Sequence, residues 1–295
     1  MGLLDSLSSL LAKANQSPEK AVALLDYLKF FGYIATDKDI SISEVIVAIR
    51  RFQEQFGISE GDIGAKTIKA MEWPRCAVKE QMVEAASVAK WGLTDITWYV
   101  RRRDSDLAPE VWDACMKRGF DVWSAVTPLK FHQVDRESQA NFVIDIGSGR
   151  ADDFDGPSGT LAWFQLVPSS NFKGQILGKF DVAETWLKDA NGNGRGIILP
   201  HVSAHEFGHG LGLVHSSRSS ALMAPFYSPT IGTPQPVDDI PRIQGIYGKG
   251  SSVPTTPTVP TPTPSPKPGK RRIIIDIDGE IDSLQADGYR ILKMG

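Results

Sequence analysis

Three of the five histidines in this 295-residue chain fall close together, at His205, His209 and His215. On a helix, His205 and His209 lie one turn apart and point the same way, so both imidazoles can reach one ion. Gly212 can adopt the positive backbone angle that ends a helix, and the chain can then turn so that His215 supplies a third nitrogen. Three neutral imidazoles with a fourth position for water are typical of a catalytic zinc site, whereas structural zinc sites hold four protein ligands.

Glu206 would lie beside this ion without binding it. Zinc lowers the pKa of a bound water toward about 7 and polarises a carbonyl group. Glu206 could then take the proton of that water and deliver it to a leaving amine. The alternative is an ordinary helix with hydrogen-bonded histidines, but Gly208, Gly210 and Gly212 would each cost such a helix about 1 kcal/mol relative to alanine. The spacing therefore favours hydrolytic zinc chemistry.

The run from His205 to His215 is similar to the long zinc signature of the metzincins, and its details resemble those of the matrixins, the matrix metalloproteinase family. The resemblance extends over residues 17–247. It implies that Met223 lies in a tight turn under the zinc site. It also implies an apolar pocket for the substrate residue just after the cleaved bond. The residues that would line this pocket are Val202, Pro225 and Tyr227.

The stretch that begins at Asp155 resembles, together with two later acidic residues, the structural calcium loop of matrixins. Carboxylates and backbone carbonyls suit this hard cation, which takes six to eight oxygen ligands. Without the resemblance, these acids would be interpreted as a solvated turn. The ligands that the resemblance implies are Asp155, Gly156, Ser158, Thr160, Asp181 and Glu184.

Matrixins also carry a structural zinc held by three histidines and an aspartate, and here the matching positions include Trp163 and Lys179. Neither side chain can bind zinc, so we predict that this second zinc is missing. Further along, Asp189, Asn191 and Asn193 could hold another calcium, but a glycine-rich turn before the active-site helix also explains them. The two remaining histidines are interpreted as ordinary; they are His132 and His201.

Cys76 is one of two cysteines in the chain. Its surroundings resemble the matrixin cysteine switch, in which a propeptide thiolate fills the fourth position on zinc. A thiol bound to zinc is deprotonated outright. The sequence departs from the family at Ala77, Lys79 and Glu80, where matrixins have Gly, Pro and Asp. Glu80 can still pair with Arg75, although its longer side chain changes the geometry. The alternative is a linker cysteine without a role.

Residues 17–71 have a helical pattern that predicts a three-helix bundle. Ser17 and Pro18 are suited to the start of the first helix. Ser41 and Glu44 form a possible capping box for the second, and a short helix near residues 67–71 follows. The bundle resembles a peptidoglycan-binding fold. Matrixins use this fold as a propeptide, whereas wall-degrading enzymes use it as an anchor.

From residue 91 onward, strand and helix patterns alternate, which implies a mixed sheet covered by helices. Cys115 lies on the apolar face of one of these helices and is interpreted as a buried core thiol. We therefore expect an α+β fold, in which the three-helix bundle precedes a matrixin-like catalytic domain with a mixed twisted sheet and three main helices. The expected parts are an amphipathic segment (1–16), the prodomain (17–82), the catalytic domain (83–248), a Pro/Thr-rich linker (249–269) and a small β tail (270–295).

A net charge of −3 gives no electrostatic footprint for a nucleic acid, and no stretch is apolar enough to span a membrane. A secretory signal is not visible, but a calcium loop suggests a location outside the cell or on the surface of a particle. We expect a zymogen of a zinc endopeptidase whose extended peptide substrate adds a strand near Leu161–Phe164. The alternatives are a hydrolase anchored through peptidoglycan and a non-catalytic zinc module of a larger assembly.

Overall fold

The computed structural model describes residues 2–35, 39–59, 63–80, 89–190 and 196–250. The expected β tail, nearly all of the Pro/Thr-rich linker, Asn191 and Asn193 lie outside these residues. Within them there are two hydrophobic cores, one in an N-terminal helical bundle and one in an α+β region. No helix in the described ranges is both long enough and apolar enough to cross a membrane.

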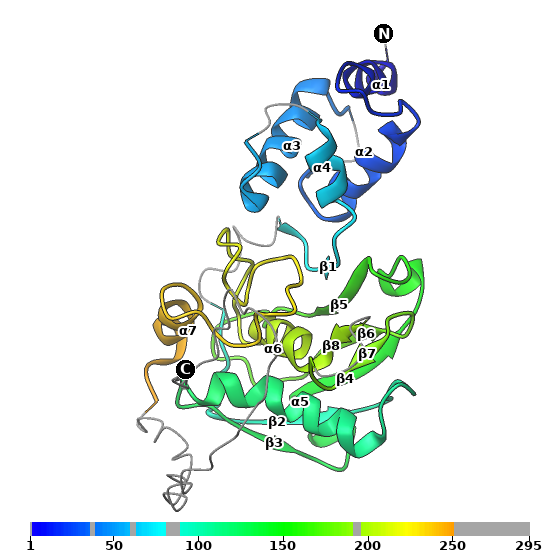
Figure 1. Cartoon of the computed structure of the whole chain (residues 1–295). Coiled ribbons are helices and arrows are strands. Elements are labelled where there is room, and N and C mark those ends of the chain that lie inside the picture. Colours follow the sequence, from blue (N-terminus) through cyan, green and yellow to red (C-terminus); the bar gives the residue numbers. More distant parts are fainter. Residues whose placement is uncertain (1, 36–38, 60–62, 81–88, 191–195, 251–295) are drawn as a thin grey trace, which may run out of the picture. The chain divides into compact units, whose positions relative to one another are not determined.

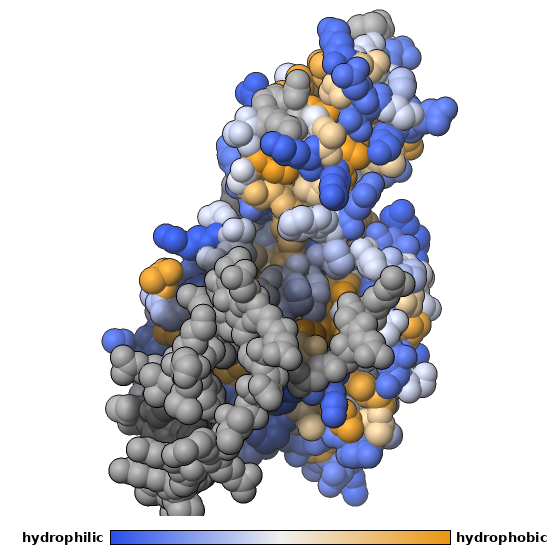
Figure 2. Space-filling view, viewed as in Figure 1, coloured by the Kyte–Doolittle hydropathy of each residue, from blue (hydrophilic) through white to orange (hydrophobic). Residues whose placement is uncertain are grey.

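The bundle consists of helices that lie together in the N-terminal part of the chain (Figure 1). Their apolar side chains share one core. The helices are α1 (Leu3–Lys13), α2 (Lys20–Phe30), α3 (Ile42–Phe56) and α4 (Ala65–Ala70). Leu7 and Leu11 of α1 are fully buried in this core, so the amphipathic N-terminal segment packs on the bundle. Some large apolar side chains nevertheless remain exposed, among them Val47 and Trp73, and hydrophobic patches are visible on the bundle in Figure 2.

The starts of α2 and α3 differ in how well the sequence predicts them. The capping box of α3 is confirmed, because Ser41 Oγ accepts from the Glu44 amide and Glu44 Oε2 accepts from the Ser41 amide. The predicted start of α2 at Ser17 and Pro18 is wrong by about two residues. These residues form a turn, and the helix begins at Lys20.

The α+β region is built on a six-stranded mixed sheet in the order β1-β5-β6-β4-β2-β3. All neighbouring strands are parallel except β5 and β6, which are antiparallel. The strands are β1 (Arg75–Cys76), β2 (Asp95–Val100), β3 (Lys130–Gln133), β4 (Phe142–Gly147), β5 (Thr160–Phe164) and β6 (Ile176–Asp181). A separate pair consists of β7 (Trp186–Leu187) and β8 (Ile197–Ile198), which are parallel. Figure 1 shows β1 running from the bundle to the sheet edge beside β5.

In the described part of the chain, three α-helices accompany the sheet, as expected, and two short 3₁₀ helices interrupt the loops. They are α5 (Pro109–Ser124), α6 (Leu199–Gly210), α7 (Asp239–Tyr247), η2 (Glu137–Gln139) and η3 (Arg150–Asp152). Helices α5 and α6 pack closely, because the rings of Phe120 and Phe207 stack with centroids 3.8 Å apart. Trp123 Nε1 also donates to the Ala204 carbonyl over 2.8 Å. This contact fixes α6, which carries the first two histidines of the motif.

Helix α6 ends in the way the sequence predicts. Gly212 has φ +97°, a left-handed conformation that favours glycine. The Leu213 amide donates to the Gly208 carbonyl over 2.9 Å and the Gly212 amide to the His209 carbonyl over 2.8 Å. These two bonds form a Schellman motif, which satisfies carbonyls at the helix end and reverses the chain toward His215.

Candidate active site

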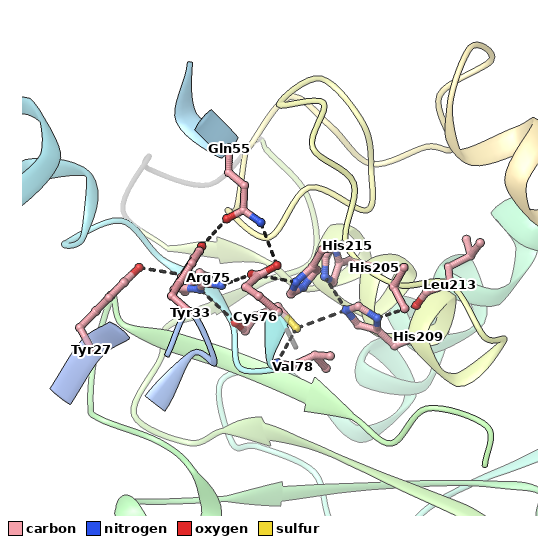
Figure 3. A network of polar contacts seen from close by, with 12 residues as sticks. Tyr27, Tyr33, Gln55, Arg75, Cys76, Val78, His205, His209, Leu213 and His215 are labelled. Atoms are coloured by element: carbon pink, nitrogen blue, oxygen red, sulfur yellow. Dashed lines mark hydrogen bonds and ion pairs between the residues drawn. The ribbon is translucent and has the colours of Figure 1, made fainter. Parts of the chain in front are cut away.

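Four buried side chains converge at the end of α6 where the chain turns (Figure 3). Their ligand atoms, from Cys76, His205, His209 and His215, all lie within 4.8 Å of one another. His209 Nε2 is 3.1 Å from His205 Nε2 and 3.5 Å from Cys76 Sγ. Among the described residues, His215 Nε2 is buried without a hydrogen-bond partner. Three imidazoles and one thiol are the donor set that zinc prefers, so the arrangement suits this ion.

The Nδ1 atoms of two of these histidines form hydrogen bonds to backbone carbonyls. His205 Nδ1 donates to the Leu222 carbonyl over 2.7 Å, and His209 Nδ1 donates to the Leu213 carbonyl over 2.8 Å. Since a carbonyl can only accept, the Nδ1 atoms carry the protons and the Nε2 atoms are free to bind metal. Burial lowers the pKa of His205 to about 3 and that of His209 well below its usual value. Both imidazoles are therefore neutral, as metal binding requires.

Glu206 is completely buried next to these ligands. Neither of its carboxylate oxygens has a hydrogen-bond partner within the described residues. Burial raises the pKa of Glu206 to about 8. A carboxyl group with a pKa near neutrality can both take and return a proton, which suits a general base that later acts as an acid.

Met223 lies directly under the histidine helix. It is fully buried, and a Cβ placed on Gly208 would collide with its sulfur. The turn that carries it is held by the carboxylate of Asp239 at the start of α7. This carboxylate accepts from the Leu222 amide over 2.7 Å and from the Met223 amide over 3.1 Å. Sequence reasoning missed Asp239, because a carboxylate 16 residues downstream of the turn leaves no local pattern.

A pocket opens beside the histidines and is lined by the three predicted residues Val202, Pro225 and Tyr227. His201 lines the same pocket, although its pattern in the sequence indicated no more than an ordinary histidine. Its Nδ1 is buried and has no hydrogen-bond partner in the described ranges. Its position one helical turn before His205 is the signal that could have identified it, since residues four apart share a helix face.

Strand β1 occupies the edge of β5, where a substrate strand was expected. The Arg75 amide donates to the Gly159 carbonyl over 2.9 Å, and the Ala77 amide donates to the Ala162 carbonyl over 3.0 Å. The two strands are parallel. The edge that a peptide could extend is therefore filled by the chain itself.

The opposite side of β1 bonds to the pocket wall. The Cys76 amide donates to the Pro225 carbonyl over 3.0 Å, and the Tyr227 amide donates to the Pro74 carbonyl over 2.9 Å. Two of the residues expected to contact substrate are thus engaged by the segment around Cys76. This segment lies across the cleft and is bonded on both sides.

Arg75 is almost completely buried within a set of polar and aromatic partners (Figure 3). Its guanidinium forms an ion pair with Glu80 over 2.6 Å, which confirms the pairing expected from the sequence. It also donates to Tyr27 Oη over 3.0 Å and to Tyr33 Oη over 3.3 Å. Gln55 Nε2 donates to Glu80 over 2.8 Å. These bonds fasten the segment around Cys76 to the bundle.

Glu80 has a further partner that the sequence did not indicate. Its Oε1 lies 3.1 Å from His215 Nδ1. Burial opposes ionisation of this carboxyl group, but His215, Arg75 and Gln55 outweigh it and hold the pKa of Glu80 at about 2. The carboxylate therefore accepts from the third histidine while it neutralises Arg75.

The expected calcium ligands lie in the loop before β5 and at the end of β6. Asp155 Oδ1 accepts from the Thr160 amide over 2.6 Å, and Glu184 Oε1 accepts from the Ser158 amide over 2.7 Å. Burial raises the pKa of Glu184 to about 7, and the charges of Asp181 and Asp155 add to this effect. Asp181 Oδ2 is buried and lacks a hydrogen-bond partner among the residues described. Burial also raises the pKa of Asp181, so a cation would stabilise the ionised forms of Asp181 and Glu184, and Gly156 has the positive φ of a tight loop.

At the positions expected for a second zinc, the chain supplies its own cation. The ammonium of Lys179 pairs with Asp152. Trp163 Nε1 donates to the Asp152 carbonyl over 2.8 Å. These residues are engaged with one another, and the absence of a second zinc stays a prediction. Elsewhere, Cys115 is buried in the core, as expected, and His132 is exposed on β3, 3.4 Å from Asp95.

Comparison with known proteins gives a consistent result. The family model described as matrixin, of peptidase family M10, matches residues 90–248. The chain is 34% identical to matrix metalloproteinase-C of Caenorhabditis elegans, over 81% of this chain and 45% of that protein. It is 34% identical to interstitial collagenase of Sus scrofa, over 84% of this chain and 54% of that protein. It is 36% identical to matrix metalloproteinase-18 of Xenopus laevis, over 80% of this chain and 51% of that protein. The chain spans about half the length of these relatives.

Proposed function

Because the chain belongs to the matrixin family of zinc metalloendopeptidases, we propose that it is a latent peptidase that cleaves extended peptides and is inhibited by its own Cys76. Matrixins use a catalytic zinc and structural calcium, and the histidine cluster fits a zinc site. The observation that carries the proposal is the convergence of three histidines and one thiol beside the buried Glu206.

His205, His209 and His215 would hold the zinc, and Cys76 would complete the set in the latent state. The orphaned Nε2 of His215 and the neutral state of His205 and His209 support this assignment. When bound, the zinc would supply an activated water and polarise the carbonyl of the scissile bond.

Glu206 takes a proton from the attacking water and later gives it to the leaving amine. The edge of β5 binds the substrate backbone as an added strand. The pocket formed by Val202, Pro225 and Tyr227 receives an apolar side chain that follows the cleaved bond. Met223 supports the histidines from below. Each of these tasks needs the cleft that β1 fills, so the segment around Cys76 must leave before substrate can bind.

The contacts of the bundle favour its interpretation as an inhibitory prodomain and not as an anchor for peptidoglycan. The bundle surrounds Arg75 and so holds Cys76 beside the histidines. We therefore assign residues 17–82 to the prodomain and residues 83–248 to the peptidase domain. Residues 155–184 would bind the structural calcium, through Asp155, Gly156, Ser158, Thr160, Asp181 and Glu184. A calcium site of this kind suits action outside the cell or on a particle surface.

The proposal is tested by hydrolysis of a fluorogenic peptide library by the full chain and its Cys76→Ser variant. We expect the full chain to be nearly silent and Cys76→Ser to cleave without proteolytic trimming, because serine does not replace the thiolate on zinc. Cys115→Ser is the matched control and should stay as silent as the parent, because that thiol is buried in the core.

Glu206→Gln in the Cys76→Ser background should lower kcat/KM by roughly 100-fold or more, with about one zinc per chain retained. Metal analysis checks the zinc content and also tests for a second zinc. A Cys76→Ser chain that holds zinc but cuts no peptide would support a structural zinc module. A silent variant that binds purified peptidoglycan would support the wall anchor.

A further inference from the structure

We propose that Glu80 is a positioning residue for the zinc site. In this view its carboxylate, which belongs to the inhibitory segment, holds the third histidine ligand, so that the prodomain tightens metal binding as well as blocking the cleft. The inference rests on the proposed function, because it assumes that His215 binds zinc. It adds a role for the prodomain that does not involve the thiol of Cys76.

The three histidines are oriented by different parts of the molecule. His205 and His209 donate to backbone carbonyls of Leu222 and Leu213, which belong to the same region as the histidines themselves. His215 instead meets the side chain of Glu80, 135 residues away in sequence. A ligating histidine depends on such a partner for its tautomer and ring orientation. The first two ligands are therefore oriented with or without the prodomain, whereas the third is oriented by it.

Glu80 is itself held firmly from the bundle side. Its amide donates to the Phe31 carbonyl over 2.9 Å. Its Oε1 accepts from both Arg75 and His215, at 2.6 and 3.1 Å, and its Oε2 accepts from Gln55 at 2.8 Å. The side chain of Glu80 is only 9% exposed. A buried carboxylate with every contact satisfied is a fixed acceptor for the Nδ1 proton of His215.

The length of the side chain matters for this contact. Glutamate has one methylene more than aspartate, and here the carboxylate spans from Arg75 to His215. Glu80, at which the sequence differs from the matrixin pattern, is thus the residue that contacts His215. Departure of the segment would remove both Cys76 and the partner of His215. We therefore expect the trimmed peptidase to bind zinc more weakly than a full chain that lacks only the thiol of Cys76.

The test measures zinc affinity of the full chain by competition with a chromophoric chelator, in a Glu206→Gln background that prevents self-cleavage. Glu80→Ala should raise the Kd for zinc by roughly 10- to 100-fold, the range found when such carboxylate partners are removed. The same factor should appear when Cys76 is already serine. If Glu80→Ala has no effect in the serine background, Glu80 acts only by holding the thiol, and the inference is overturned.

Tyr27→Phe is the matched control, because Tyr27 contacts Arg75 but not His215. It loosens the Arg75 cage and should change the Kd for zinc less than about threefold, because the His215 contact stays intact. If Tyr27→Phe and Glu80→Ala lower the zinc affinity equally, general loosening of the segment explains the effect, and the inference is overturned. A parent chain that binds no zinc at all would refute the proposed function instead, so the two failures are distinguishable.

Glu80→Gln keeps the shape of the side chain, so it covers the case in which the alanine variant fails to fold. With ¹⁵N-labelled histidine, the Nδ1 resonance of His215 should shift in Glu80→Gln, whereas those of His205 and His209 should stay unchanged. If the His215 resonance is the same in parent and variant, Glu80 does not orient this ring, and the inference is wrong.

Discussion

His201 and Glu206 lie on the same helix, and each has a buried polar atom without a partner in the described part of the chain. Such atoms cost free energy unless a ligand or ion engages them, so buried orphans often mark sites of function. Glu206 has a proposed role in proton transfer. His201 lies in the wall of the pocket and offers a hydrogen-bond acceptor or donor there.

Replacement of His201 by leucine should change which substrate side chain the pocket prefers. We expect the ratio of kcat/KM for a peptide with leucine after the cleaved bond to one with glutamine there to rise about fivefold, since one hydrogen bond of about 1 kcal/mol is lost. The measurement uses the Cys76→Ser chain with and without His201→Leu. An unchanged ratio would show that the histidine does not contact the substrate side chain.

At the scale of elements, the start of α7 supports the turn that carries Met223. Asp239 is fully buried and accepts from the amides of Leu222, Met223 and Gln235. The turn therefore depends on a helix that follows it in the chain. The carbonyl of Leu222 in turn orients His205, so α7 contributes indirectly to the metal site.

Asp239→Ala should destabilise the chain by about 3 kcal/mol or more, because it leaves several buried amides without an acceptor. Urea unfolding followed by tryptophan fluorescence measures the change. Asp121→Ala is the control and should cost little, because Asp121 is exposed and forms a surface ion pair with Lys117. If the two variants unfold at the same urea concentration, Asp239 does not support the turn.

Strand β4 contains the buried acid Asp145, whose charge should make the stability of the fold depend on pH. Burial acts to raise the pKa of Asp145, but hydrogen bonds from Arg102, the Ile146 amide and Arg101 outweigh it and hold the pKa below its usual value. A lowered folded-state pKa gives stability that is present above the unfolded-state pKa and lost as the pH falls through the folded-state value. The ionised form of Asp145 is thus the stabilising one.

Asp145→Asn should cost about 2 kcal/mol at neutral pH, where the charge-assisted bonds to Arg101 and Arg102 are lost. Below a pH of about 4, the usual pKa of an aspartate, the difference between parent and variant should shrink as the parent carboxyl protonates. Thermal unfolding across this pH range checks the prediction. A difference that stays constant with pH would mean that shape, and not charge, decides the effect.

On the scale of the whole molecule, the proposed latency would depend on contact between the pocket wall and the core of the bundle. Phe226 follows Pro225 in the pocket wall, yet its ring packs on Phe56 of the bundle with centroids 3.6 Å apart. Arg75 lies over the ring of Phe226, 4.7 Å from its centroid. The same wall that would contact substrate is therefore packed against the bundle.

Phe56→Ala should weaken this docking and increase the basal peptide hydrolysis of the full chain several-fold, because a large aromatic contact is lost. After removal of residues 17–82, the parent and the variant should hydrolyse the peptide at the same rate, because the trimmed peptidase no longer contains Phe56. Val47→Ala on the same helix is the control, because Val47 is exposed. Basal hydrolysis equal to that of the parent would mean that the zinc-thiol contact alone maintains latency.

Features that depend on local spacing could be predicted from the residues alone. Two histidines one helical turn apart must share a face, and a glycine two residues past the end of α6 must permit the reversal that brings His215 back. These rules act over a few residues, so the pattern was sufficient to indicate the histidine cluster and the neighbouring Glu206. The mixed sheet followed from the alternation of strand and helix patterns in the same way.

The distant side chains that meet around that cluster could not be predicted in this way. Glu80 and His215, Arg75 and Tyr27, and Asp239 and the turn at Met223 are joined by packing between elements. The periodicity of the sequence does not predict such pairs, because each depends on how the bundle, the sheet edge and α7 pack together. Local sequence therefore specifies the chemistry of the ligands, whereas the folded arrangement determines what orients them and what covers the cleft.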